Sequence, residues 1–343
     1  MVVDTTGMDK AIAYPVDSRL LQIARHKIAS AAKRAGITLK LTFANEGKTL
    51  RRKAGDYAHA KQFRCLKRIV KRQRTILGVV MREAQREQEA DRQAIAAGGA
   101  PAPQPSDPKA ISDLLMWFER AERIRTQQRH DKNKLYALHA PEVEWISKGK
   151  ARKPYEFGVK VSLAVTHKQG LMVGARSFPG NPYERHILAA QLVRTTNLLQ
   201  DLGRSTTQAI MDLGFRGVDA DNPGMEIIHR GRYKPLTSQH KRWLKRRQAI
   251  EPMIGHAKSD NRMDCCWLQG ALCDALHALS CAAGYKIGRL LRAIARLAVK
   301  RSLLLFLKLA MPGRISVNVS LVSLLDALAR FVDHPPGRPY SAT

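Results

Sequence analysis

YEFGVKVSLAV, residues 155–165, decides the fold class, because its apolar residues alternate with small or polar ones. The apolar set is Phe157, Val159, Val161, Leu163 and Val165. A period of two is typical of a half-buried β-strand. The following stretch, GLMVGARSFPGNP at 170–182, has the pattern of a second strand that ends in a Gly/Pro turn. We therefore predict an antiparallel hairpin that turns around Lys168 to Gly170.

The segments after this hairpin alternate between helix and strand patterns. ERHILAAQLVRTTNLLQDLG has an amphipathic helical period and stops at Gly203. TTQAIMD and GMEIIHRG are short strand patterns that end at Asp212 and near His229, and another helix begins at about Ser238. Apolar helices are expected from Cys265 to Leu309. This order predicts an α/β fold in which a mixed sheet is flanked by helices.

Helical patterns fill the region before the hairpin. A short β-prone start ends at Asp4, and helical periods follow over 18–34 and about 57–97. A Gly/Pro-rich linker, 96–108, then precedes another helical stretch. We therefore divide the chain into a first core strand (1–17), a helical insertion (18–135), the remainder of the core with C-terminal helices (136–311) and a tail with weak signals (312–343).

The charge balance points to a polyanionic partner. Lys and Arg number 59 against 29 Asp and Glu, a formal net charge of +30. Such a surface binds nucleic acid by releasing its counterions, although a basic surface can also serve solubility alone. The five cysteines include no C-x-x-C pair, so we predict small buried thiols rather than zinc or disulfides. The N-terminus has no signal pattern, and the longest apolar run, LLLFLKLAM from Leu303, is far short of the ~20 residues that cross a bilayer. We expect a cytosolic protein.

Three acidic residues occupy positions at which open sheets commonly bind ligands or place catalytic groups. Asp4 and Asp212 each end a predicted strand, and Glu251 lies on the following helix. If the two strands are neighbours, the three carboxylates can converge. Hard oxygen donors favour Mg²⁺ or Mn²⁺, and two such ions are a common means of in-line phosphodiester attack. Arg247 and Lys258 would then flank the scissile strand.

The surrounding stretch, RRQAIEPMIGHAK at 246–258, admits a second interpretation. Arg247, Glu251 and Lys258 are separated by four and seven residues, the spacing of one helical face. A solvated series of surface ion pairs would show the same spacing. Pro252 favours the catalytic interpretation, because a kink costing ~3 kcal/mol has a purpose beside a carboxylate that must be aimed.

Three separated motifs carry a resemblance. VVDTT at the start, MDLGFRG around Asp212 and RRQAIEPMIGHAK around Glu251 resemble the DDE transposases of bacterial insertion sequences, in the group that contains the insertion-sequence-five family. The group's signature of Arg, three residues, Glu, six residues, Lys falls on Arg247, Glu251 and Lys258. HAPEVEWISKGKARKPYEFGVKVSLA and GNPYERH look like further family stretches. The resemblance runs from residue 2 to about 298.

The resemblance implies an RNase H-like sheet with a large helical insertion after the first strand. Asp4, Asp212 and Glu251 would hold two Mg²⁺ or Mn²⁺ ions, which activate water to nick a transposon end and then the freed 3′-hydroxyl to attack target DNA. Arg246, Arg247 and Lys258 would contact DNA. The implied partners are transposon-end and target DNA and further copies of the chain, without a membrane, in bacterial cytoplasm at the nucleoid. The basic insertion would bind DNA or a second subunit, or be a solvated face; its cations include Lys67, Arg68, Lys71, Arg72 and Arg74.

The chain departs from the family pattern at three places. Leu244 and Phe215 stand where tyrosine is common, and only Met1 to Val3 precede Asp4, where the family has a region that recognises the transposon ends. We therefore expect a truncated copy, and an inactive, basic DNA-binding relic is the alternative function. An assembly protein that uses the 57–97 helices is a third possibility. A glycosidase-type carboxylate pair is disfavoured by the few aromatic residues, 6% of the chain, and by the positive charge.

Overall fold

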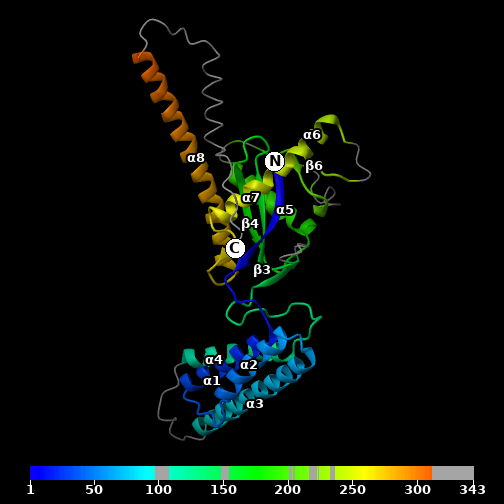
Figure 1. Ribbon diagram of the computed structural model, residues 1–343, viewed down its shortest axis with the longest axis vertical. Helices are drawn as coiled ribbons and strands as arrows, with labels where there is room; N and C mark the ends of the chain where they lie inside the picture. The colour runs from blue at the N-terminus through cyan, green and yellow to red at the C-terminus, as the bar shows by residue number, and fades with distance from the viewer. Residues whose placement is uncertain are drawn as a thin grey trace. The chain divides into compact units, whose positions relative to one another are not determined.

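The computed structural model describes residues 1–96, 108–147, 154–200, 203, 205–215, 222, 224–231 and 236–310. By its internal contacts the chain forms two compact units, 1–281 and 282–343. The first unit contains a mixed sheet flanked by helices and a separate set of packed helices, both drawn in Figure 1. The predicted α/β class is confirmed at this level. The predicted tail, 312–343, lies outside the described residues.

The sheet has seven strands among the described residues, in the order β2-β3-β1-β5-β6, with β4 on β3 and β7 on β1. Their bounds are β1 Val2–Lys10, β2 Glu144–Ser147, β3 Tyr155–Val165, β4 Met172–Phe178, β5 Gln208–Ile210, β6 Glu226–Ile228 and β7 Cys265–Cys266. β1 to β4 pair antiparallel through β3, whereas β1, β5 and β6 run parallel. The predicted hairpin is confirmed as β3 and β4, and β2 is a strand that the sequence patterns did not indicate.

The first strand is longer than predicted. Asp4 does not end β1, which continues to Lys10 and pairs with β3 from Val2 opposite Val165 to Asp9 opposite Gly158. Close approach makes this register possible, because a Cβ atom on Gly158 would lie 1.9 Å from the carbonyl oxygen of Met8. The extra length anchors β1 in the centre of the sheet, and Asp4 projects from within a paired strand.

Short helices cover the sheet and complete its core. They are η1 Glu184–Ile187, α5 Leu188–Gln200, η2 Leu213–Phe215, α6 Ser238–Arg246, η3 Arg247–Ala249 and α7 Ile250–Ser259. Val3, Ala164 and Ala209 from the strands pack against Leu188, Leu192 and Phe215 from these helices. Burial of this apolar surface, at roughly 25 cal/mol per Å², holds the helices that carry the acidic residues on the sheet.

The helical insertion comprises four helices that pack together in Figure 1. They are α1 Asp17–Arg34, α2 Ala44–His59, α3 Phe63–Ala96 and α4 Pro108–Thr126. Leu21, Ile28, Leu77 and Leu114 are fully buried in their shared core. The prediction of one helix over 57–97 was wrong. The chain breaks at Lys61, whose φ of 55° is left-handed, and Gln62 N donates to Tyr57 O (2.8 Å), a turn that contains neither Gly nor Pro.

The C-terminal helical region also differs from its prediction. Instead of several helices from Cys265, the chain forms β7, which pairs with Asp9 and Lys10 of β1, and then a single helix, α8 Ala271–Ala310. All five cysteines are free thiols, and burial raises the pKa of Cys266 and Cys281 to about 11. Within the described part of the chain, none of the helices combines the length and apolar character needed to span a bilayer.

Candidate functional site

Asp4 and Asp212 come from neighbouring parallel strands. Val2 of β1 pairs with Ile210 of β5, and Ile210 N donates to Met1 O (2.9 Å). Each aspartate therefore follows its paired residue by two positions, which places both on one part of the sheet. The condition set for convergence of the acids, that these two strands are neighbours, is met. The Asp4 side chain is 19% exposed and that of Asp212 is 56% exposed. Asp4 is therefore largely buried, and Asp212 is accessible to solvent.

Arg247 joins the two aspartates. Its Nη1 donates to Asp4 Oδ2 at 3.0 Å, and its Nη2 lies 3.8 Å from Asp212 Oδ2. The other oxygen of each acid accepts a backbone N–H, from Thr5 (2.8 Å) and from Leu213 (2.7 Å) respectively. Arg247 is itself only 16% exposed. The arrangement is a pair of oriented carboxylates with one guanidinium between them.

The spacing argument assumed that Arg247, Glu251 and Lys258 lie on one continuous helix. The structure divides this segment. Arg247 begins η3, which separates α6 from α7, whereas Glu251 and Lys258 both lie on α7. Pro252 is the third residue of α7. Its missing N–H is therefore one that has no partner in the first turn, so the expected costly kink within a helix is absent. The backbone stays in the right-handed helical region through η3, and from this turn the Arg247 side chain contacts the two aspartates.

The remaining predicted site residues do not join this cluster. Glu251 is exposed and has no ion-pair partner among the described residues. Lys258 Nζ lies 4.0 Å from Glu156 Oε1, and Arg246 Nη2 donates to Lys168 O (3.0 Å). The alternative series of ion pairs along 247, 251 and 258 is therefore not formed either. The structure brings together Asp4, Asp212 and Arg247, the last in contact with both acids.

A third acid, Glu184, belongs to the same cluster, and the sequence patterns did not single it out. Glu184 lies on η1, and its Oε1 accepts a hydrogen bond from the hydroxyl of Thr5, the residue after Asp4. It also lies against Gly214, where a Cβ atom would come within 1.8 Å of Glu184 Oε2. A signal was present, since Glu184 stands in GNPYERH directly after the turn that ends the hairpin.

The electrostatics of Asp4 reflect this crowding of acids. Burial raises the pKa of Asp4, and the nearby Asp212 and Glu184 raise it further, while the Thr5 N–H and Arg247 oppose them. The rise prevails, so one guanidinium does not fully offset the cost of the Asp4 charge.

The two departures from the family pattern within this region are core residues. Leu244 of α6 is 5% exposed and Phe215 of η2 is fully buried. Each fills apolar space next to a predicted site residue, Arg247 and Asp212 respectively. A phenol hydroxyl at either buried position would need a hydrogen-bond partner, which an apolar side chain does not.

The acids fit a hard divalent cation in their chemistry. Asp4, Asp212, Glu184 and Glu251 offer only carboxylate oxygens, the donors that Mg²⁺ and Mn²⁺ prefer. Their arrangement, in contrast, holds an arginine between Asp4 and Asp212. Among the described residues, no group of three or more His, Cys, Asp or Glu side chains is arranged to hold a metal ion. The three-carboxylate set of Asp4, Asp212 and Glu251 stays a prediction.

Comparisons with known proteins give one short match. Over 61 residues the chain is 44% identical to an uncharacterized protein, ORF8 in the nfe locus of Rhizobium meliloti. The matched stretch covers 18% of this chain and 30% of that protein. No family model matches the chain, and no solved structure matches it.

Proposed function

We propose that the chain is a metal-dependent DNA transposase of the DDE type, with an RNase H-like sheet and Asp4, Asp212 and Glu251 as its acids. One observation carries the proposal: Asp4 and Asp212 lie on adjacent parallel strands, and Arg247 of the RRQAIEPMIGHAK stretch contacts both. Segments far apart in the sequence meet at this point, and each belongs to one of the stretches that carry the resemblance. The net charge of +30 supports DNA as the substrate.

The residues of the chain have distinct roles in this proposal. Asp4, Asp212 and Glu251 would hold Mg²⁺ or Mn²⁺, which would supply activation of the attacking oxygen and stabilisation of the leaving one. Thr5 N–H and Leu213 N–H orient the two aspartates, so that their free oxygens face Arg247. Arg247 holds the two acids together before DNA binds. Glu184 is a positioning residue, because it acts on Asp4 through Thr5.

Cations near the acids would bind the phosphates. Arg246 is exposed, and Lys258 lies on the same helix as Glu251. Both extend from the segment that carries Arg247, so they would contact the strand on either side of the reacting phosphate. Phosphate contacts of this kind fix the register of the DNA rather than read its sequence.

The proposal is tested by nicking of supercoiled plasmid in Mn²⁺, with the parent chain, Asp212→Asn and the matched control Asp91→Asn, an exposed acid of α3. We expect Asp212→Asn to lose at least about a hundredfold in nicking rate, a typical effect of removing a group that acts on the transition state. Asp91→Asn should keep the parent rate. Duplex binding in EDTA should be equal in all three proteins.

Two outcomes would oppose the proposal. Equal loss of binding and nicking in Asp212→Asn would mean that Asp212 supports the fold rather than the reaction. DNA binding by the parent without metal-dependent nicking would favour the alternative, an inactive relic that binds duplex through its charge. Calorimetric Mn²⁺ titration of the parent and Glu251→Gln, each with a short duplex, then shows whether Glu251 contributes to a metal site.

A further inference from the structure

The helical insertion contains a basic groove with a volume of about 1200 Å³. It is lined by the start of α1, by α2, by the first half of α3 and by the loop after α4. Eight of its 18 lining residues are Lys or Arg, and one, Asp17, is acidic. Apolar side chains, among them Val16, Leu66 and Val70, make up part of the lining between the cations. The groove is therefore cationic with apolar parts.

Most of these cations have no acidic partner. Arg74 is the exception, since its Nη2 lies 3.8 Å from Asp17 Oδ2. Within the described part of the chain, no carboxylate lies within ion-pair distance of Lys48, Arg52, Lys67 or Lys71. By contrast Arg72, the neighbour of Lys71, does not line the groove and is paired with Glu46 at 2.7 Å. The unpaired positive charge is thus gathered on the groove side.

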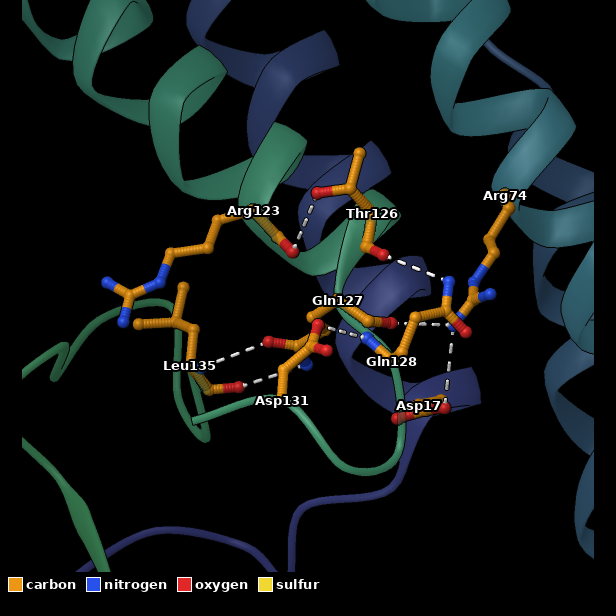
Figure 2. Close-up of polar contacts among 8 residues, drawn as sticks. All are labelled: Asp17, Arg74, Arg123, Thr126, Gln127, Gln128, Asp131 and Leu135. Carbon is orange, nitrogen blue, oxygen red and sulfur yellow. Dashed lines mark hydrogen bonds and ion pairs between the residues drawn. The ribbon is translucent and has the colours of Figure 1, made fainter. Parts of the chain in front are cut away.

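One wall of the groove is held by a polar network, shown in Figure 2. Arg74 Nη2 donates to Gln127 O (3.1 Å), and the Gln127 side chain exchanges two hydrogen bonds with the backbone of Leu135 (3.0 and 3.3 Å). Gln128 N donates to Asp131 Oδ2 (2.7 Å). These bonds fix the loop that presents Gln128 and Arg129 to the groove, so the cations are organised before a ligand arrives.

We propose that this groove binds the sugar–phosphate backbone of DNA, as a second DNA contact in addition to the Asp4 site. Cations distributed over three helices and a loop match a series of phosphates rather than a single small anion. The apolar parts of the lining suit the deoxyribose units between them. A second copy of this chain, with a net charge of +30, is a poor occupant for a cationic groove. The inference rests on the proposed function in taking DNA as the polyanion.

The test compares two triple variants that each remove three positive charges from the insertion. The groove variant is Arg52→Gln, Lys67→Gln and Lys71→Gln; the control is Lys33→Gln, Lys53→Gln and Arg64→Gln, all exposed and outside the groove lining. Binding of a labelled 20-bp duplex is followed by fluorescence anisotropy in EDTA, over a series of salt concentrations. EDTA removes any contribution from divalent ions at the acids.

For the groove variant we expect the slope of the logarithm of the association constant against log salt to become less negative by about 2.7, from the loss of three phosphate contacts at about 0.9 each. The Kd at 0.1 M salt should rise at least about a hundredfold. The control should change the slope by less than about 1. Both variants should keep the parent's thermal unfolding, since the substituted side chains are exposed. Equal effects in the two variants, or none in the groove variant, would overturn the proposal.

Further measurements distinguish this inference from the proposed function. Asp212→Asn should bind the duplex like the parent in EDTA, because it leaves the groove intact; loss of plasmid nicking with intact groove binding counts against neither inference. If the groove variant instead loses binding of polyglutamate and keeps DNA, the groove serves an acidic protein and the proposal is wrong. A change in sedimentation of the groove variant without a change in DNA binding would likewise assign the groove to assembly.

Discussion

Strand β1 contributes one residue to each of two charged clusters, Asp4 near its start and Lys10 at its end, and in each cluster a single cation contacts two carboxylates. In the first, which we call the open cluster, Arg247 lies between Asp4 (3.0 Å) and Asp212 (3.8 Å). In the second, the closed cluster, Lys10 lies between Asp274 (2.5 Å) and Glu142 (2.9 Å). Side chains of the closed cluster are 3% to 11% exposed, whereas those of the open cluster are 16% to 56% exposed.

The difference indicates which cluster stabilises the fold and which is available for chemistry. In the closed cluster, burial opposes the charge of Lys10, but its bonds to Asp274 and Glu142 prevail and raise the pKa of Lys10. Burial also opposes the charge of Glu142, yet Lys10 and the N–H of Gly270 (2.7 Å) lower the pKa of Glu142. In the open cluster the pKa of Asp4 is raised. In the closed cluster the contacts of Lys10 and Glu142 therefore outweigh the cost of burying their charges, whereas in the open cluster the contacts of Asp4 do not.

Breaking the closed cluster should have the largest effect on stability. Lys10→Met leaves Asp274 and Glu142 buried without their cation, so we expect the free energy of unfolding to fall by about 3–5 kcal/mol. Urea denaturation of the parent and variant measures the change. Arg247→Met is the matched substitution in the open cluster, and it should change the free energy of unfolding by no more than about 1 kcal/mol, because solvent reaches Asp212. Equal losses in the two variants would contradict the contrast between the clusters.

The contribution of the closed cluster to the free energy of unfolding should depend on pH. The folded pKa of Glu142 is lowered, so its contribution to stability is present above its ordinary value of 4.5 and is lost as the pH falls through the folded value. The folded pKa of Lys10 is raised, so its contribution is present below 10.5 and is lost as the pH rises beyond that value. The Lys10→Met deficit should therefore be largest between about pH 4.5 and 10.5 and shrink below pH 4.5. A deficit that stays constant down to pH 3 would show that packing, not charge, causes it.

Neutralising Asp4 should stabilise the protein. Because the folded pKa of Asp4 is raised above 3.8, its ionised form is disfavoured by the fold, and stability is lost as the pH rises through the folded value. Asp4→Asn keeps the shape and removes the charge, so we expect a gain on the order of 1 kcal/mol, or about 2 °C in Tm, at pH 7. The gain should vanish as the pH falls toward 3.8. A lower Tm at pH 7 would mean that the bond to Arg247 outweighs the cost of burial.

These two clusters also show what the sequence patterns could and could not predict. The strand patterns predicted that Asp4 and Asp212 each end a strand, which holds for Asp212 but not for Asp4. Periodicity reports which residues face a core and not which strands pair, so the adjacency of the two strands was only a condition of the prediction and comes from the structure. Helical spacing did not predict that Arg247 would contact Asp4 and Asp212, because spacing within one helix carries no information about partners that are distant in the sequence. The closed cluster escaped notice because Lys10 and Asp274 are far apart in the sequence and stand in no motif.

Glu184 makes the contrast sharper, because it adds a third carboxylate to the open cluster. With Glu184 the cluster has three acids and one guanidinium, a formal charge of −2, against −1 for Lys10 with Asp274 and Glu142. Glu184→Gln keeps an acceptor for the Thr5 hydroxyl and removes the repulsion, so the pKa of Asp4 should fall. The free energy of unfolding should change by no more than about 0.5 kcal/mol.

Carboxyl ¹³C titration of Asp4 in the parent, in Glu184→Gln and in the control Glu119→Gln, an exposed acid of α4, measures this change. Identical Asp4 curves in the first two proteins would remove Glu184 from the cluster. A shift confined to Glu184→Gln would place three acids around a single arginine. The closed cluster, with a formal charge of −1, is buried and has hydrogen bonds that compensate its charges, whereas the open cluster is partly exposed and carries a formal charge of −2 around a single arginine.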